Sequence, residues 1–203
     1  MRFDGRVTGS FLDVPLLVGE HVRLEPLEPR HAEGLALAAA DGDVWRKWTT
    51  SVPAPGETAD DVARRLAAHA TGRIVPWATC LPDGTPVGET TYWAIDPVNR
   101  RVEIGATWLS ASVQGTKVNP EAKLLQLTRA FEVLDCIAVE FRTHWHNRQS
   151  RRAIAALGAK QDGVLRNHQV MRDGTMRDTV VFSILRDEWS AVRAGLLARL
   201  GRG

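Results

Sequence analysis

Some segments of the chain alternate apolar and polar residues with a period of two, and the segments between them carry apolar residues at spacings of three and four. A two-residue alternation is typical of a half-buried β-strand, because successive side chains point to opposite faces of a sheet. In residues 101–110, Val102, Ile104, Ala106 and Trp108 alternate with other positions in this way, which places these four side chains on one face. Similar signals predict strands over residues 20–28, 75–95 (two strands joined by a turn), 101–110, 136–146, 160–171 and 177–185.

Other segments carry apolar residues at spacings of three and four, which is the period of an amphipathic helix. Residues 147–159 begin with Asn147, a good N-cap, and reach Gly158, a residue type that ends helices. Helices are expected over about residues 29–40, 57–72, 120–134, 147–159 and 186–200.

The order of these elements mixes hairpins with strand–helix–strand connections, which predicts one mixed sheet with helices on both faces. The fold class is therefore α/β in its mixed α+β form. A length of 203 residues suits a single domain over residues 1–203. Residues 1–18 are interpreted as an N-terminal extension and residues 186–203 as the C-terminal helix.

Composition excludes several classes of protein. The formal net charge is +2, so no strong field favours a nucleic acid or an anionic membrane. No apolar run is long enough to span a bilayer, and the first residues do not resemble a signal peptide. Cys80 and Cys136 lie in apolar segments and are interpreted as free thiols in a reducing cytoplasm, with a disulfide as the alternative. The chain lacks cysteine and histidine clusters at ligand spacing, so we expect no metal.

The segment 113–125, "VQGTKVNPEAKLL", begins as a polar loop and ends as a helix. Asn119 is a suitable N-cap and Pro120 suits the first helical position. The free amides and positive dipole end of a helix that follows a strand suit a phosphate group. An ordinary strand-to-helix loop explains the segment equally well.

Four motifs, taken in order, resemble the GNAT superfamily of acyl-CoA-dependent N-acetyltransferases, and especially the branch that acetylates ribosomal-protein N-termini. They are "EIGATWLS", "VQGTKVNPEA", "HNRQSRRAIAALGAKQDGVLRNH" and "GTMRDTVVFSILRDEW". The resemblance covers most of the chain. It implies a single GNAT-like domain with a mostly antiparallel central sheet, and transfer of an acetyl group from acetyl-CoA to a primary amine.

The resemblance also implies which residues hold the cofactor. Gln114 matches the first position of the family's pyrophosphate loop, and the later Asn-x-x-Ser pattern lines the other side of the cofactor. A backbone amide on the strand ending at Leu109 is expected to polarise the acetyl carbonyl. The cofactor-binding candidates are Leu109, Gln114, Gly115, Thr116, Lys117, Val118, Asn119, Asn147, Ser150 and Arg151.

One departure from the family pattern concerns the loop itself. Lys117 stands where the family has glycine, and Asn119 replaces the last small residue. A lysine can still donate its own amide, and a helical residue needs no positive φ. We therefore interpret the loop as altered but working. The alternative is a non-catalytic protein of the same fold that binds CoA or a partner.

The catalytic candidates are Glu103 as the base for the attacking amine and Ser150 as the proton donor to the leaving thiolate, with water as an alternative donor. The superfamily often uses a tyrosine as donor, but Tyr92, the chain's sole tyrosine, lies elsewhere in the sequence. Glu89 is a weaker base candidate. His144 and His146 are alternatively a proton relay or ordinary strand-end histidines.

The expected partner is an amine acceptor, either a protein N-terminus or a small molecule, and Trp45 and Trp48 lie where this family shapes its acceptor site. A basic run between Arg142 and Arg152 is better explained by nearby CoA phosphate or by solvation than by nucleic acid. We expect neither nucleic acid nor membrane as a partner, and a homodimer is left open.

Overall fold

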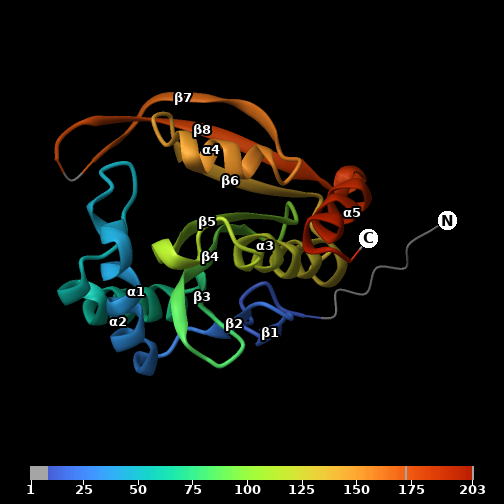
Figure 1. Cartoon of the computed structure of the whole chain (residues 1–203). Helices are drawn as coiled ribbons and strands as arrows, with labels where there is room; N and C mark the ends of the chain where they lie inside the picture. Colours follow the sequence, from blue (N-terminus) through green and yellow to red (C-terminus); the bar gives the residue numbers. More distant parts are fainter. Residues whose placement is uncertain (1–8, 172, 203) are drawn as a thin grey trace.

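The computed structural model describes residues 9–171 and 173–202, and a single sheet organises them (Figure 1). Its strands are β1 (Leu17–Val18), β2 (Arg23–Pro26), β3 (Val75–Cys80), β4 (Pro86–Asp96), β5 (Arg101–Leu109), β6 (Ala138–His144), β7 (Lys160–Val170) and β8 (Met176–Leu185). The α-helices are α1 (Ala32–Ala40), α2 (Thr58–Ala70), α3 (Val118–Thr128), α4 (Arg148–Ala155) and α5 (Trp189–Leu200). A π-helical turn, Arg129–Val133, continues α3, and short 3-10 turns cover Pro29–His31, Asp41–Arg46, Pro55–Glu57, Ala111–Val113 and Arg186–Glu188.

The eight strands run in the order β1-β2-β3-β4-β5-β6-β8-β7. Strands β5 and β6 are parallel, and every other neighbouring pair is antiparallel. The predicted fold class, a mixed and mostly antiparallel sheet in a GNAT-like domain, is confirmed.

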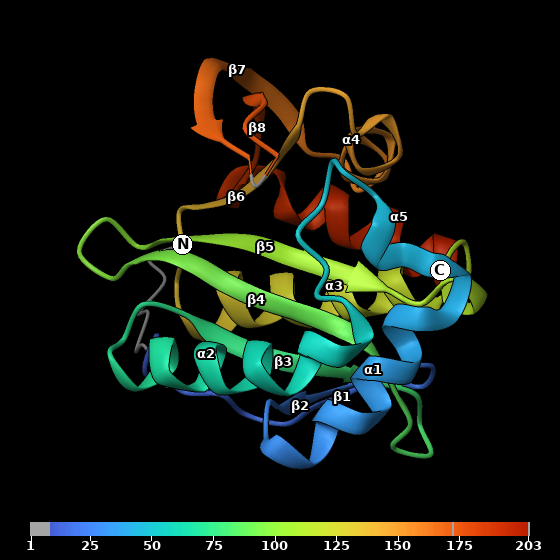
Figure 2. The same ribbon diagram turned by 90° about the vertical axis from the view of Figure 1, so that its left-hand side faces the viewer.

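Helices cover both faces of the sheet, as predicted. Figure 2 shows α1 and α2 in front of β3 and β4, with α3 behind them. One apolar core joins the sheet to α3 and α5 and includes Ile104, Leu127 and Leu196. The other lies under α1 and α2 and includes Leu35, Val62 and Trp108. No helix of the described residues is long and apolar enough to cross a membrane.

The buried carboxylate of Glu121 ties the segment before β2 and the residues after α5 to the first turn of α3. It accepts the backbone amides of Glu20 at 3.0 Å and His21 at 2.5 Å, and the guanidinium of Arg202 lies 2.5 Å away. Residues 19–22 form the turn between β1 and β2, in which the amide of Gly19 donates to the carbonyl of Val22 at 2.8 Å, and Glu121 holds two other amides of this turn, so β2 begins at Arg23 rather than at residue 20 as predicted. Glu121 thereby anchors the helix that carries the predicted cofactor loop.

Cys80 and Cys136 are both buried free thiols, as predicted. Burial raises the pKa of each thiol to about 12, so neither is reactive at neutral pH.

Candidate active site

The sheet opens between β5 and β6. The two strands pair only from Arg101 to Glu103, opposite Ala138 to Glu140, although β5 continues to Leu109 and β6 to His144. Beyond Glu103 the strands diverge, and Figure 1 shows β5 with α3 on one side of the separation and β6 with α4 on the other. Beyond Glu103, the facing edges of β5 and β6 therefore do not pair with each other.

A β-bulge in β5 shapes this opening. Glu89 pairs with Trp108 and Thr91 pairs with Gly105, so Thr90 alone faces both Ala106 and Thr107. Ala106 has a φ of +46°, and Ala106 and Thr107 are exposed in an otherwise largely buried strand.

The bulge reverses the alternation of side chains along β5. Val102 and Ile104 pack in the core shared with α3, whereas Trp108 packs under α1 and α2. The sequence prediction that Trp108 shares a face with Val102 and Ile104 was wrong, because periodicity cannot register one inserted residue. Thr107 instead takes the α3 face.

The backbone amide of Leu109 is turned toward the opening. The neighbouring amide of Ser110 donates to the carbonyl of Val87 on β4 at 2.8 Å. Because successive amides of a strand point to opposite edges, the amide of Leu109 faces the side where β6 has diverged. The carbonyl of Leu109 accepts the side-chain amide of Gln114 at 2.8 Å, which joins the strand to the following loop.

The loop after β5 offers several unused backbone donors. Gly115 has a φ of +78°, a left-handed conformation that favours glycine. The hydroxyl of Thr116 donates to the carbonyl of Val113 and accepts the amide of Val118 at 3.3 Å. Within the described chain, the amides of Gln114, Thr116 and Val118 have hydrogen-bond acceptors, whereas those of Gly115, Lys117 and Asn119 have none. This combination at a helix N-terminus is suited to an anion.

Helix α3 begins at Val118, two residues before the predicted start, and Lys117 occupies the N-cap position. The prediction that Asn119 is the N-cap was therefore wrong. Lys117 has helical angles, φ −71° and ψ −12°, and its carbonyl already accepts the amide of Glu121 at 3.1 Å. Pro120 is compatible with this earlier start because the amides of the first helical turn need no partner inside the helix.

The side chain of Lys117 reaches toward the end of α5. A Cβ atom built on Gly201, which caps α5, would lie 3.9 Å from Lys117 Nζ. Carbonyl groups at a helix C-terminus favour a nearby cation. The lysine thus has a place outside the row of free amides.

Helix α4 presents a second helix N-terminus to the opening. Asn147 caps it, as predicted, by accepting the amide of Ser150 at 3.0 Å. Gln149, which the sequence analysis did not single out, donates to Gln114 Oε1 at 3.0 Å and accepts from Lys47 at 3.3 Å. The guanidinium of Arg151 lies 4.1 Å from the ring centroid of Trp145.

Glu103 lies at the inner end of the opening, in the last β5–β6 pair. Its carboxylate is 3.4 Å from Arg142, and only 15% of its side chain is exposed. Burial raises the pKa of Glu103, and the guanidinium of Arg142 opposes that effect. A Cβ on Gly105 would lie 2.9 Å from Glu103 Oε1, so a glycine at this position leaves room for the carboxylate.

The other weighed carboxylate, Glu89, faces α2 instead. It accepts the indole N–H of Trp108 at 2.8 Å and lies 3.4 Å from Arg65. Burial raises the pKa of Glu89. Its position under α2 separates it from the row of amides on the loop.

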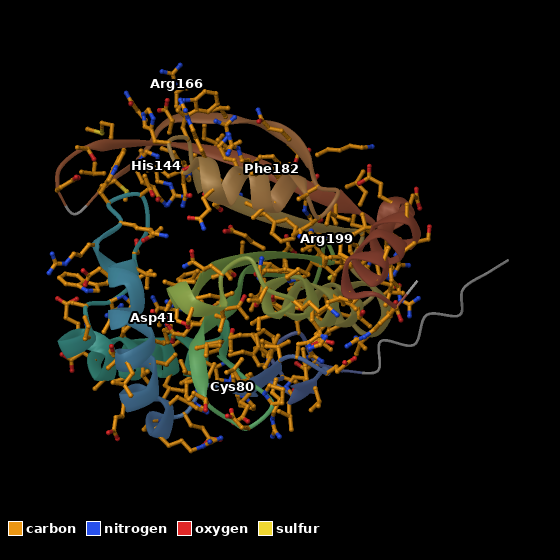
Figure 3. The ribbon with its side chains drawn as sticks, viewed as in Figure 1. Asp41, Cys80, His144, Arg166, Phe182 and Arg199 are labelled. Carbon is orange, nitrogen blue, oxygen red and sulfur yellow. The ribbon has the colours of Figure 1, made fainter. Side chains whose placement is uncertain are left out.

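Trp48, His144 and His146 form a cluster of rings near the end of β6, beside the opening. The rings of Trp48 and His144 pack edge to face with centroids 5.0 Å apart, and His146 lies 5.5 Å from His144. Figure 3 labels His144 among the strands above the opening. His144 Nδ1 accepts the amide of His146 at 3.1 Å, while the buried Nε2 has no partner among the described residues. Burial lowers the pKa of His144, so the ring favours its neutral form.

Tyr92 is fully buried and outside the opening. Its hydroxyl donates to the carbonyl of Gln126 at 2.5 Å, and burial raises its pKa. The hydroxyl of Tyr92 is therefore enclosed in the core and bonded to the backbone of α3.

Glu25, His31 and Cys80 bring three ligand-type atoms within 4.8 Å of one another beneath β2 and β3. The carboxylate of Glu25 is already held by Arg30 at 2.8 Å and Arg23 at 3.1 Å. Two cations and a thiol whose pKa is about 12 oppose the binding of another cation. The cluster is better described as a buried polar network.

Comparisons with known proteins agree with this geometry. The family model "Acetyltransferase (GNAT) domain" matches residues 21–160. The chain is 30% identical over 179 residues to the Bacillus subtilis protein described as "Putative ribosomal N-acetyltransferase YdaF", which covers 85% of this chain and 95% of that protein.

Two solved structures are similar over most of their length. A GCN5-related N-acetyltransferase from Brucella melitensis has a TM-score of 0.83 at 28% identity, covering 92% of this chain and 85% of that one. Mycobacterium smegmatis RimJ, solved in complex with CoA-disulfide, has a TM-score of 0.74 at 25% identity, covering 93% of both chains.

The chain belongs to the GNAT acetyltransferase family, and it is an enzyme that transfers an acetyl group to an amine. The comparisons give no support to the non-catalytic alternative that Lys117 had suggested.

Proposed function

We propose that the protein transfers the acetyl group of acetyl-CoA to the α-amino group of a protein or peptide N-terminus. One observation carries this proposal: the diverging edge of β5 leads directly to a loop with three unused amides at the start of α3. A thioester and a pyrophosphate need these two kinds of donor in this order.

The described residues fit the pyrophosphate of CoA. The amides of Gly115, Lys117 and Asn119, together with the positive end of α3, supply donors without any deprotonation step. Asn147, Ser150 and Arg151 lie at the start of α4, and the contact between Gln149 and Gln114 brings that helix to the loop. The complex of RimJ with CoA-disulfide supports the assignment.

Three residues have proposed roles in the chemistry. The amide of Leu109 donates to the carbonyl oxygen of the thioester, which makes the carbonyl carbon more electrophilic. Glu103 accepts a proton from the ammonium of the acceptor, so that a neutral amine attacks that carbon. As the carbon–sulfur bond breaks, Ser150 or a water molecule supplies the proton for the thiolate of CoA, and the proton that the newly acetylated nitrogen releases replaces it.

The raised pKa of Glu103 suits the proposed role, because a base must be strong enough to take a proton from an ammonium group. Trp48, His144 and His146 form the neighbouring wall and would contact the acceptor. The description of YdaF as a putative ribosomal N-acetyltransferase favours a protein over a small amine as the acceptor.

Turnover tests the proposal. Release of free CoA from acetyl-CoA is measured with peptides of varied first residues and, in parallel, with small amines and with peptides whose N-terminus is blocked. Acetylation of free N-termini alone is the expected result, and mass spectrometry of the product locates the acetyl group. Faster acetylation of the small amines would overturn the choice of acceptor, and no stabilisation of the fold by millimolar acetyl-CoA would overturn the choice of donor.

A further inference from the structure

A lysine side chain is buried directly beneath the bulge of β5. Lys123, in the second turn of α3, is 4% exposed. Its Nζ lies 2.9 Å from Thr107 Oγ1, 3.0 Å from Thr90 Oγ1 and 2.9 Å from Gln126 Oε1. All three partners are neutral oxygens. Among the residues that the structure describes, no carboxylate forms an ion pair with this amine.

This amine is not needed to satisfy the polar groups around it. The hydroxyls of Thr90 and Thr107 lie 2.8 Å apart, and the hydroxyl of Thr90 donates to Gln126 Oε1 at 3.1 Å. The three oxygens therefore keep hydrogen-bond partners in the absence of Lys123. Burying a cation without a counter-ion is also costly, so an apolar side chain of similar length would suit the core at least as well.

The two hydroxyls belong to the two sides of the bulge. Thr90 is the single residue of β4 that faces the inserted pair, and Thr107 is the second member of that pair. Lys123 bonds both, so its amine fastens the irregular part of β5 to β4 from below. The next amide of β5 that faces the opening is that of Leu109, the proposed donor to the thioester carbonyl.

We propose that Lys123 is a positioning residue of the acetyl-transfer centre, which fixes the β5 bulge through Thr90 and Thr107 and thereby aims the amide of Leu109. The proposal rests on the proposed function of the opening. Displacement of a preorganised donor by less than an ångström is enough to weaken its effect on the developing oxyanion.

The acidic groups nearest to Lys123 on the neighbouring elements all face other partners or stay neutral, so the ionisation of Lys123 can be measured separately. The carboxylate of Glu121 on α3 is occupied by the amides of residues 20 and 21, Glu89 on β4 faces α2, and Glu103 on β5 faces Arg142. Tyr92 is the titratable residue of β4 that faces α3, and it stays neutral because burial raises its pKa. Burial alone lowers the pKa of Lys123 to about 7.

The test is Lys123→Met, measured with acetyl-CoA and the best peptide acceptor. We expect kcat to fall by about tenfold or more, as for a misplaced oxyanion donor. The dissociation constant for CoA should stay within about threefold and the melting temperature should not fall, since the variant replaces a buried amine by an apolar chain. The pH profile of kcat should also lose an ionisation near 7. Lys160→Met, which removes an exposed lysine from β7, is the matched control and should leave kcat unchanged.

A second variant reaches the bulge from the other side. Thr107→Val keeps the shape of the side chain and removes the hydroxyl that Lys123 binds. If Lys123 and Thr107 both act through the bulge, either substitution alone already removes the support of the bulge. The kcat of the Lys123→Met/Thr107→Val double variant should then be no lower than that of the slower single variant.

Two failures are distinguishable. A wild-type protein that binds acetyl-CoA but acetylates no amine would refute the proposed function. An active wild type, together with a Lys123→Met variant whose kcat and pH profile are unchanged, or that loses activity only in proportion to a lowered melting temperature, overturns this inference alone.

Discussion

In the loop after β5, Gly115 supplies a positive φ and Lys117 supplies a free backbone amide, two properties that a single glycine at position 117 would provide. Gly115 takes the positive φ, +78°, and Lys117 follows with helical angles and an amide that no described residue accepts. A side chain at position 117 therefore causes no backbone strain. The departure from the family pattern changes the charge beside the loop and leaves the backbone donors in place.

Lys117→Gly should weaken CoA binding by a few-fold at low salt and hardly at all at high salt. An exposed ammonium near a phosphate contributes about 0.3–1 kcal/mol to the binding free energy, and salt screens this contribution. A tenfold change in the dissociation constant needs about 1.4 kcal/mol. Calorimetric titration of CoA at two salt concentrations measures the effect. Lys117→Met is the control that removes the charge and keeps a side chain, and it should match the glycine variant. Tenfold tighter binding by the glycine variant would instead identify the lysine as an obstruction.

Tyr92→Phe should leave turnover within about twofold of wild type, because its buried hydroxyl is bonded to the carbonyl of Gln126 and cannot reach a thiolate in the opening. Loss of that hydrogen bond should lower the free energy of unfolding by about 1 kcal/mol. Steady-state kinetics and urea denaturation measure the two quantities. A hundredfold loss of kcat, the scale of general acid catalysis, would show that the proton donor has been misassigned.

The pattern of the sequence predicted the elements well because its signals are local. The alternation in residues 136–146 and the cap at Asn147 need no knowledge of the rest of the chain, and the strand and helix they predict are present. The start of α3 was missed by two residues because Asn119 and Pro120 are as acceptable inside the first turn as at its edge.

The site was less predictable because it depends on contacts between distant segments. The sequence around Ala106 contains no signal for a β-bulge. The bulge turns the side chain of Thr107 toward α3. The signal that could have identified Lys123 was a lysine within a helix whose apolar residues cover more than one face. Gln149 and Arg142 act through partners far away in the sequence, Gln114 and Glu103, and only the folded chain brings them together.

Glu103→Gln should lower kcat/KM by about a hundredfold or more, since general base catalysis contributes on this scale. Burial raises the pKa of Glu103, so the acidic limb of the wild-type pH profile should lie above the usual range of a glutamate, and activity should be lost as pH falls through it. The glutamine variant should lose that limb.

The matched control for Glu103 is Glu140→Gln, which alters the residue opposite in the β5–β6 register and should keep kcat/KM within about threefold. Equal losses in both variants would indicate that the pairing with Arg142, and not the base, is what matters. A Glu103→Gln variant of unchanged activity would direct attention to His144.

The pH dependence of stability should reveal Lys123. Its pKa is about 7 in the folded protein and, like that of any exposed lysine, about 10.4 in the unfolded chain. Between these values the unfolded chain binds one more proton than the native state, so the free energy of unfolding rises with pH by up to about 1.4 kcal/mol per pH unit.

The two cysteines change the stability in the opposite direction. Burial raises the pKa of both thiols to about 12, whereas unfolded thiols ionise above about pH 8.5, so their contribution to the free energy of unfolding falls as pH rises. Subtracting the values for Lys123→Met from those for wild type cancels the cysteine contribution. Urea denaturation of both proteins between pH 7.5 and 9.5 should therefore give a difference that grows in favour of wild type as pH rises. A difference that stays flat would mean that Lys123 is fully charged inside the fold, and the neutral amine beneath the bulge would have to be abandoned.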